Sequence, residues 1–177
     1  MAVRIFPVLF TGFRGVSGEF LGSKSMKPMP LTWSGRPDWN RIFAPFGFNP
    51  PSSAFFHLPN MVRYIYFIQS GDLVKVGVSS DPKARLKSFR AGAPNGLMLR
   101  GTIEVPGILA FQTEKRIHAE LKHVAVGREW FRISPREARS VAKPICARAK
   151  AAASRFWECH DAFEEMRADG LIAQEAA

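Results

Sequence analysis

The sequence is poor in the residues that form disulfides and structural metal sites. It contains two cysteines, Cys146 and Cys159, no C-x-x-C arrangement and only four histidines among 177 residues. These are too few ligands for a four-ligand zinc site, and two isolated cysteines are typical of reduced thiols in the cytosol. We therefore expect neither a disulfide framework nor a structural zinc.

The sequence also lacks a long hydrophobic run. No segment reaches the roughly 18 consecutive apolar residues that a membrane-spanning helix needs. The run Ile-Phe-Pro-Val-Leu-Phe10 is shorter than a typical signal-peptide core and contains a proline. These absences predict a cytoplasmic protein without a membrane partner.

Acidic residues are scarce relative to basic ones. The chain has 15 Asp and Glu against 25 Lys and Arg, a formal net charge of +10, which favours a polyanionic partner such as nucleic acid. Residues 61–133 carry 12 basic and 6 acidic groups, residues 134–155 carry 6 and 1, and residues 156–177 carry 1 and 6. We expect the acidic end to be a solvated or self-docking tail rather than part of a polyanion site.

Residues 1–60 have a different composition from the rest of the chain. They hold 8 of the 13 prolines and 9 of the 15 phenylalanines, without a helical or strand period. We expect an irregular arm. It is either a leader or a wrongly chosen start before Met61, or a genuine arm that packs its aromatic side chains on the following domain.

Regular patterns begin after residue 60. Alternating residues predict strands near 64–69, 73–78 and 97–105. Capping residues and apolar periodicity predict helices over 82–90 and 108–122. A last helix begins at Ser134-Pro135, and Pro144 is expected to interrupt or kink it. We therefore predict a mixed domain over 61–133 and a helical extension with an acidic tail over 134–177.

The first two predicted strands form a hairpin around Gly71-Asp72. In this register Tyr66 lies opposite Gly77 and Ile68 lies opposite Lys75. One face suits a core and collects Ile65, Phe67, Val74, Val76 and Val78. The other face collects Tyr64, Tyr66, Ile68, Lys75, Gly77 and Ser79. A glycine opposite Tyr66 lets another group approach the phenol closely; the alternative is a bulge beside a solvated lysine.

The order of residues after this hairpin is more specific than the hairpin itself. Tyr64-x-Tyr66 is followed by Lys75-x-Gly77, then by Arg85-Leu86, Glu114-x-x-x-His118 and Glu129-Trp130-Phe131. This series resembles the GIY-YIG nuclease superfamily, in particular its phage-associated branch of the phage T5 open-reading-frame and meiotically up-regulated gene type, whose second motif is K-I-G. The resemblance covers about residues 64–133.

The resemblance implies a fold, a reaction and a set of site residues. The fold is α+β, a small three-stranded antiparallel sheet flanked by helices, and the reaction is cleavage of DNA phosphodiesters with one divalent metal, Mg²⁺ or Mn²⁺. Matched by position, the catalytic residues are Tyr66, Lys75, Arg85, Glu114 and His118, with Glu114 as the metal ligand. The residues expected to contact nucleic acid are Tyr64, Gly77, Ser79, Lys83, Lys87 and Arg90. A tyrosine of the usual second motif is replaced here by Lys75.

Phosphodiester hydrolysis needs an activated water and stabilisation of negative charge on the phosphoryl oxygens. Tyrosine is a poor base at neutral pH, but a nearby ammonium or metal-bound water favours its phenolate. Lys75 either supplies that charge to Tyr66 or binds a phosphate directly. Arg85, one turn into a helix, either aims its planar donors at two phosphate oxygens or forms a surface salt bridge.

Glu114 and His118 are four residues apart and share one face of an apolar-periodic helix. A carboxylate beside a buried stripe needs a partner, and Mg²⁺ with several retained waters would serve. Two ligands are too few for a zinc site, and His118 either contacts substrate or is purely structural. The aromatic residues of Glu129-Trp130-Phe131 are expected to close the core, while Glu129 pairs with a basic side chain.

The leading hypothesis is therefore a metal-dependent endonuclease that hydrolyses DNA. The alternative is a non-catalytic DNA-binding module of the same fold, whose binding would weaken with salt and ignore chelators. A third hypothesis is an interaction protein whose N-terminal arm contacts a partner.

Overall fold

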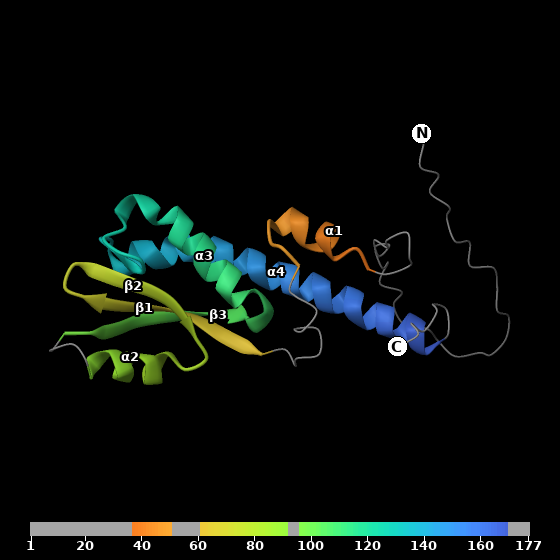
Figure 1. The fold of residues 1–177 in the computed structure, drawn as a ribbon, viewed down its shortest axis with the longest axis horizontal. Helices are drawn as coiled ribbons and strands as arrows, with labels where there is room; N and C mark the ends of the chain where they lie inside the picture. Colours follow the sequence, from red (N-terminus) through yellow and green to blue (C-terminus); the bar gives the residue numbers. More distant parts are fainter. Residues whose placement is uncertain (1–36, 51–60, 92–95, 170–177) are drawn as a thin grey trace, which may run out of the picture.

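The sheet lies toward one side of the molecule, with two short helices and part of one long helix packed on it (Figure 1). The computed structural model describes residues 37–50, 61–91 and 96–169. The strands are β1 (Val62–Ser70), β2 (Leu73–Ser79), β3 (Met98–Pro106) and β4 (Trp130–Phe131), in the order β3-β1-β2-β4. All their pairings are antiparallel. The predicted α+β class is confirmed, with a fourth, two-residue strand beyond the three expected.

The predicted hairpin register is confirmed. Tyr66 pairs with Gly77 and Ile68 pairs with Lys75 across β1 and β2. Gly71 occupies the turn with a φ of 57°, a left-handed conformation that glycine adopts without a steric penalty. The alternation of side chains along both strands then sends two different sets of residues to the two faces of the sheet.

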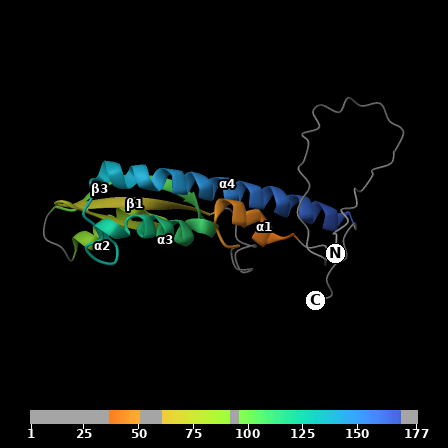
Figure 2. The same cartoon turned by 90° about the horizontal axis from the view of Figure 1, so that it is seen from above.

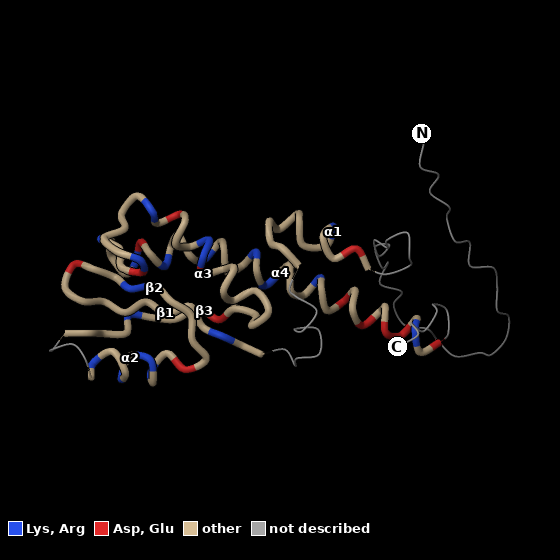
Figure 3. Tube along the Cα trace, viewed as in Figure 1, with Lys and Arg blue, Asp and Glu red and all other residues tan. Residues whose placement is uncertain are grey.

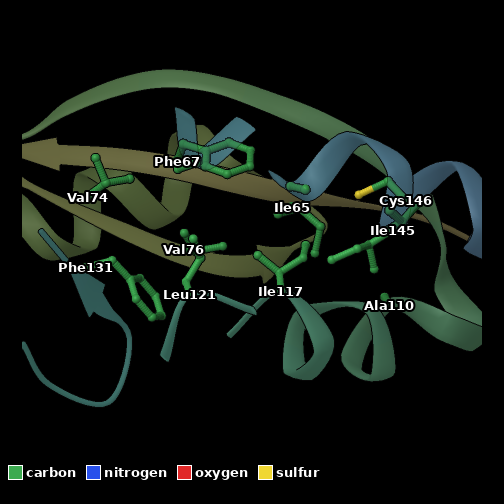
Figure 4. Close-up of a cluster of buried hydrophobic side chains, with 13 residues drawn as sticks. Ile65, Phe67, Val74, Val76, Ala110, Ile117, Leu121, Phe131, Ile145 and Cys146 are labelled. Atoms are coloured by element: carbon green, nitrogen blue, oxygen red, sulfur yellow. The ribbon is translucent and has the colours of Figure 1, made fainter. Parts of the chain in front are cut away.

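One face of the sheet carries the main hydrophobic core. It is covered by α3 (Ala110–Glu120) and by the first half of α4 (Pro135–Ala168). Figure 4 shows Phe67, Val76 and Ile117 among the buried side chains of this cluster. Ala138, Ala142 and Cys146 belong to the same buried cluster. The core therefore continues past residue 134 into the long helix.

The opposite face of the sheet is covered by α2 (Pro82–Arg90) (Figure 1). Tyr66 and Ile68 are buried there, packed against Leu86 and Phe89 of the helix. The helix begins where the sequence predicts: the Asp81 side chain accepts hydrogen bonds from the Lys83 and Ala84 N–H groups, and Pro82 is the first helical residue.

Helix α4 is more continuous than the sequence predicts. Ser134 and Glu137 form a capping box at its start, but Pro144 does not interrupt the helix as expected. Pro144 and Ser140 are both exposed. The Ser140 carbonyl, which loses its intrahelical donor to the proline, can therefore be solvated.

Part of the segment 1–60 is described, and it packs on the second half of α4. Helix α1 (Trp39–Phe43) and the 3-10 turn η1 (Ala44–Phe46) lie beside α4 in both views (Figures 1 and 2). Phe43 and Phe156 are fully buried in the shared cluster, with ring centroids 5.6 Å apart. Residues 37–50 thus place aromatic side chains on the domain, while the rest of the predicted arm lies outside the described residues.

Short elements complete the chain: the 3-10 turns η3 (Gly107–Leu109) and η4 (Lys122–Val124) flank α3. Among the described residues, no helix is long and apolar enough to cross a membrane.

Candidate active site

The candidate site lies along the edge of β2, where the short strand β4 stops. β4 pairs only with Val74 and Lys75. Farther along this edge, side chains of α3 take the place of a neighbouring strand. Glu114 Oε1 accepts a hydrogen bond from the Val78 N–H (3.1 Å), and the Val76 carbonyl lies 2.9 Å from His118 Nε2. Because a carbonyl only accepts, His118 Nε2 carries the proton of this bond.

The spacing of the Glu114-x-x-x-His118 pair matches the spacing of these backbone groups. One helical turn rises about 5.4 Å, and two residues of a strand span about 6.6–6.8 Å. Two side chains one turn apart on α3 therefore reach two polar groups one repeat apart on β2. This gives His118 a structural role at the strand edge. The second carboxylate oxygen of Glu114 has no hydrogen bond to the described residues.

Tyr66 reaches this edge from β1 by passing over Gly77. The residue is only 2 % exposed, and a Cβ atom at Gly77 would lie 2.3 Å from the phenol oxygen. The glycine was expected to leave room for another group to approach the phenol. That expectation is wrong, because the phenol ring itself fills the space above Gly77.

The phenol of Tyr66 keeps its proton at neutral pH. Burial raises its pKa above the usual value near 10, while a hydrogen bond and the positive charge from Arg85 lower it. The carboxylates of Glu129 and Glu114 raise it again. Burial dominates, so in this state Tyr66 is a hydrogen-bond donor rather than a base. Arg85 is the cation that acts most strongly on it.

Arg85 sits in the first turn of α2, where the cap fixes the backbone. Its N–H donates to the Asp81 carbonyl (3.1 Å), and its guanidinium lies over the Phe89 ring at 4.8 Å from the centroid. The side chain is exposed and forms no salt bridge with a described carboxylate. Its planar donors are therefore available to an anion beside Tyr66.

Lys75 is held more tightly than the sequence suggested. It is 8 % exposed and forms an ion pair with Glu129. Its ammonium lies 5.1 Å from the centroid of the Phe89 ring and 5.6 Å from that of Trp130, a cation–π arrangement. In this conformation Lys75 is bound to a carboxylate between two aromatic rings, which leaves it little freedom to contact a phosphate.

The two glutamates of the site have opposite electrostatics. Burial raises the pKa of Glu114, an effect that the nearby His118 partly offsets. The hydrogen bond from Lys75 lowers the pKa of Glu129, and His118 and Arg85 lower it further. Glu129 is therefore a firmly ionised partner of Lys75. Glu114 is a carboxylate in an environment that favours neutralisation, which a cation would relieve.

The described residues fit a metal held by few protein ligands. They contain no cluster of three or more His, Cys, Asp or Glu side chains arranged around a possible ion. Mg²⁺ is commonly bound through one or two carboxylates together with waters and substrate phosphate. The unbonded oxygen of Glu114 suits this role, whereas Glu129 is engaged by Lys75 and His118 uses Nε2 on the backbone.

The residues predicted to contact nucleic acid fall into two groups. Lys83 and Lys87 are exposed on α2, four residues apart on one side of the helix. The guanidinium of Arg90 donates instead to the Leu97 carbonyl, at 3.2 and 2.7 Å, and so secures the start of β3. The Ser79 hydroxyl accepts from the Asp81 N–H, Tyr64 is half-buried, and Gly77 lies under Tyr66.

Sequence reasoning missed two parts of the site. It did not identify Phe89 and Trp130 as the rings around Lys75, and it paired Tyr66 with Lys75 rather than with Arg85. A basic residue on the buried face of a predicted strand was the available signal, since a buried ammonium requires partners. The identity of those partners depends on how α2 and β4 pack.

The site combines a small antiparallel sheet, a buried tyrosine, a helix arginine and a carboxylate with one unbonded oxygen. Residues 63–146 match the family model of the T5orf172 domain. The match indicates a nuclease-like or DNA-related function for this part of the chain, in agreement with the resemblance to the phage T5 type. It contains every candidate site residue. No curated protein and no solved structure matches the chain.

Proposed function

We propose that residues 61–146 form a metal-dependent endonuclease that hydrolyses DNA phosphodiester bonds. The observation that carries the proposal is the convergence of Tyr66, Arg85 and Glu114 from three different elements on one edge of the sheet. Helix α2 also exposes Lys83 and Lys87, and these charges suit a polyanionic substrate.

Each of the three residues has a task in the proposed reaction. Arg85 directs planar donors at the phosphoryl oxygens and stabilises their growing negative charge. Tyr66, which holds its proton, donates a hydrogen bond to the same group. Glu114 offers the free carboxylate oxygen to Mg²⁺. When bound, the ion supplies Lewis-acid charge and lowers the pKa of its water.

A plasmid-nicking assay with Mg²⁺ or Mn²⁺ tests the proposal. The informative variant is Glu114→Gln, because the amide oxygen can still accept the hydrogen bond from the Val78 N–H while the negative charge is lost. Its matched control is Glu120→Gln, the same change at an exposed position of the same helix. We expect metal-dependent nicking in the wild type and the control, and a loss of about 100-fold or more in Glu114→Gln.

Two further variants separate the other roles. Tyr66→Phe keeps the buried ring and removes only the hydroxyl, and Arg85→Lys keeps the charge and removes the planar fork. Both should lose most of the nicking activity while keeping the far-UV circular dichroism of the wild type. A wild-type protein that binds DNA but never cuts it, across metals and across single- and double-stranded substrates, contradicts the proposal.

One observation favours a non-catalytic DNA-binding module as the second candidate. Lys75 stands at the second-motif position and is bound to Glu129, so Glu114 remains the main carboxylate for a metal. A binding module would hold DNA equally well with and without EDTA, and its affinity would fall steeply with salt. The nicking assay distinguishes the two candidates directly.

A further inference from the structure

The β3 strand contains a bulge on the edge of the sheet opposite the candidate active site. Phe67 pairs with Gly101 and the next residue, Ile68, pairs with Leu99, so Arg100 is an extra residue in the ladder. Gly101 has a φ of 153°, outside the range that most side chains adopt. A bulge of this kind changes the direction of a side chain at a sheet edge, here that of Arg100.

Arg139 of α4 packs directly on this bulge. A Cβ atom at Gly101 would lie 3.3 Å from the guanidinium carbon of Arg139, so the glycine provides the space in which that group lies. One terminal nitrogen of Arg139 donates to the Arg100 carbonyl at 3.4 Å. Its Nε is buried without a hydrogen-bond partner. The guanidinium is therefore held in place by backbone and is only partly satisfied.

Arg100 is positioned by a neutral group as well. Its Nε donates to Gln69 Oε1 at 2.6 Å, and the Gln69 amide in turn donates to the Gly71 carbonyl at 2.8 Å. Neither Arg100 nor Arg139 forms a salt bridge with a described carboxylate. Arg139 thus contacts the backbone of Arg100, while the Arg100 side chain is held by the Gln69 amide.

The surrounding part of α4 extends this positive surface. Arg136 and Lys143 are exposed and lie three residues before and four residues after Arg139, on the same side of the helix. Figure 3 shows basic residues along the first half of α4 and acidic ones near its end. Arg136 and Lys143 are about 10 Å apart along the helix axis. Phosphates recur about every 3.4 Å along each DNA strand, so the row can face more than one of them.

We propose that Arg100 and Arg139 form a second phosphate-contacting site for the DNA backbone, continued by Arg136 and Lys143. Arginines that form no salt bridge with a described carboxylate favour an anionic ligand, and planar guanidinium groups suit phosphate oxygens. The sheet order places β3 at the opposite edge from β2 and β4. The site would therefore contact a part of the DNA away from the scissile bond. That the ligand is DNA rests on the proposed function.

The test is the salt dependence of DNA binding by the full chain in EDTA, measured by fluorescence anisotropy with a labelled 30-base-pair duplex. Arg100→Ala and Arg139→Ala should each weaken binding severalfold and reduce the slope of log K against log salt by about 1. The matched control is Arg167→Ala, which removes the same charge near the end of α4, where the arginine pairs with Glu164. The control should leave the slope unchanged.

Folding is measured by thermal melting and catalysis by nicking, each separately from DNA binding. Arg139→Ala removes a packed side chain, so thermal melting accompanies each variant. If Arg139→Ala unfolds, the exposed Arg100→Ala decides the question. A wild-type slope in Arg100→Ala, or no DNA binding by the wild type, overturns this site. A reduced slope without any nicking leaves the site standing and removes the endonuclease proposal. If the wild type nicks DNA but Arg100→Ala keeps the wild-type slope, the endonuclease proposal stands and this second site is removed.

Discussion

The two faces of the β1–β2 hairpin are built from the same strands but are stabilised in different ways. The face toward α3 and α4 is filled by Ile65, Phe67 and Val76, which need only apolar neighbours. The face toward α2 buries the phenol of Tyr66 and the ammonium of Lys75. Each of these polar groups requires a partner from another element. The stability of the first face therefore depends on how well apolar side chains fill the available volume. The stability of the second face depends on where α2, α3 and β4 place the partners of its polar groups.

The largest expected effect separates the two faces by stability. Phe67→Ala empties part of the apolar core and should lower the free energy of unfolding by about 3–5 kcal/mol. Tyr66→Phe, at the neighbouring residue on the other face, keeps the ring and should lower it by only about 1 kcal/mol. Urea denaturation followed by circular dichroism measures both. Equal losses of stability in the two variants would contradict a difference in how the two faces are stabilised.

The second prediction targets the glycine beneath Tyr66. In Gly77→Ala the added Cβ would lie 2.3 Å from the phenol oxygen, so the ring must move. We expect a loss of about 1–3 kcal/mol in stability, measured by urea denaturation, together with loss of any nicking activity. Gly127→Ala is the control, since nothing lies within 4 Å of a Cβ there. Wild-type stability and activity in Gly77→Ala would contradict the placement of Tyr66.

The third prediction measures the Lys75–Glu129 pair by a double-mutant cycle with Lys75→Met and Glu129→Gln. The Glu129 side chain is 45 % exposed, so solvent screens the pair and a coupling of about 1 kcal/mol is expected at pH 7. The pKa of Glu129 is lowered by Lys75. Its contribution is therefore present above the ordinary carboxyl pKa and is lost as the pH falls through the lowered value. Coupling that persists below that pH would contradict an ionic pair.

The smallest effect concerns the other glutamate and has the opposite sign. Burial raises the pKa of Glu114, so the folded state disfavours its ionised form and loses stability as the pH rises through the raised pKa. Glu114→Gln should therefore raise the Tm at pH 7 by about 1–2 °C, a small change because partial exposure screens it. The gain should disappear at pH 4. Glu120→Gln serves as the control, and a lower Tm in Glu114→Gln at pH 7 would contradict the pKa direction.

Local sequence signals predicted much of the fold. The turn at Gly71, the alternation of Ile65 and Phe67, and the Asp81-Pro82 helix start act over a few residues, and the structure has all three. Pro144 was the exception, because it was expected to interrupt or kink α4 and the helix continues through it. Its predicted effect on α4 ignored that the affected turn faces solvent, where a carbonyl without a donor is readily hydrated.

The candidate site was predicted as a set of residues rather than as a set of contacts. Tyr66, Arg85 and Glu114 do come together, but Lys75 is bound to Glu129 and Gly77 is covered by Tyr66. These pairings join residues up to 54 positions apart. They depend on side-chain directions that periodicity does not determine. The catalytic roles themselves stay predictions until the nicking assay is done.

The shortness of β4 also affects how copies of this chain can interact. A strand edge with unpaired N–H and C=O groups can template aggregation with another chain. Glu114 and His118 bond the Val78 N–H and the Val76 carbonyl, so these two backbone groups are not open to a strand of another chain. A chain that lost both side chains would expose a short template for intermolecular sheet growth. Solubility would then be a second reason to keep the residues proposed for catalysis.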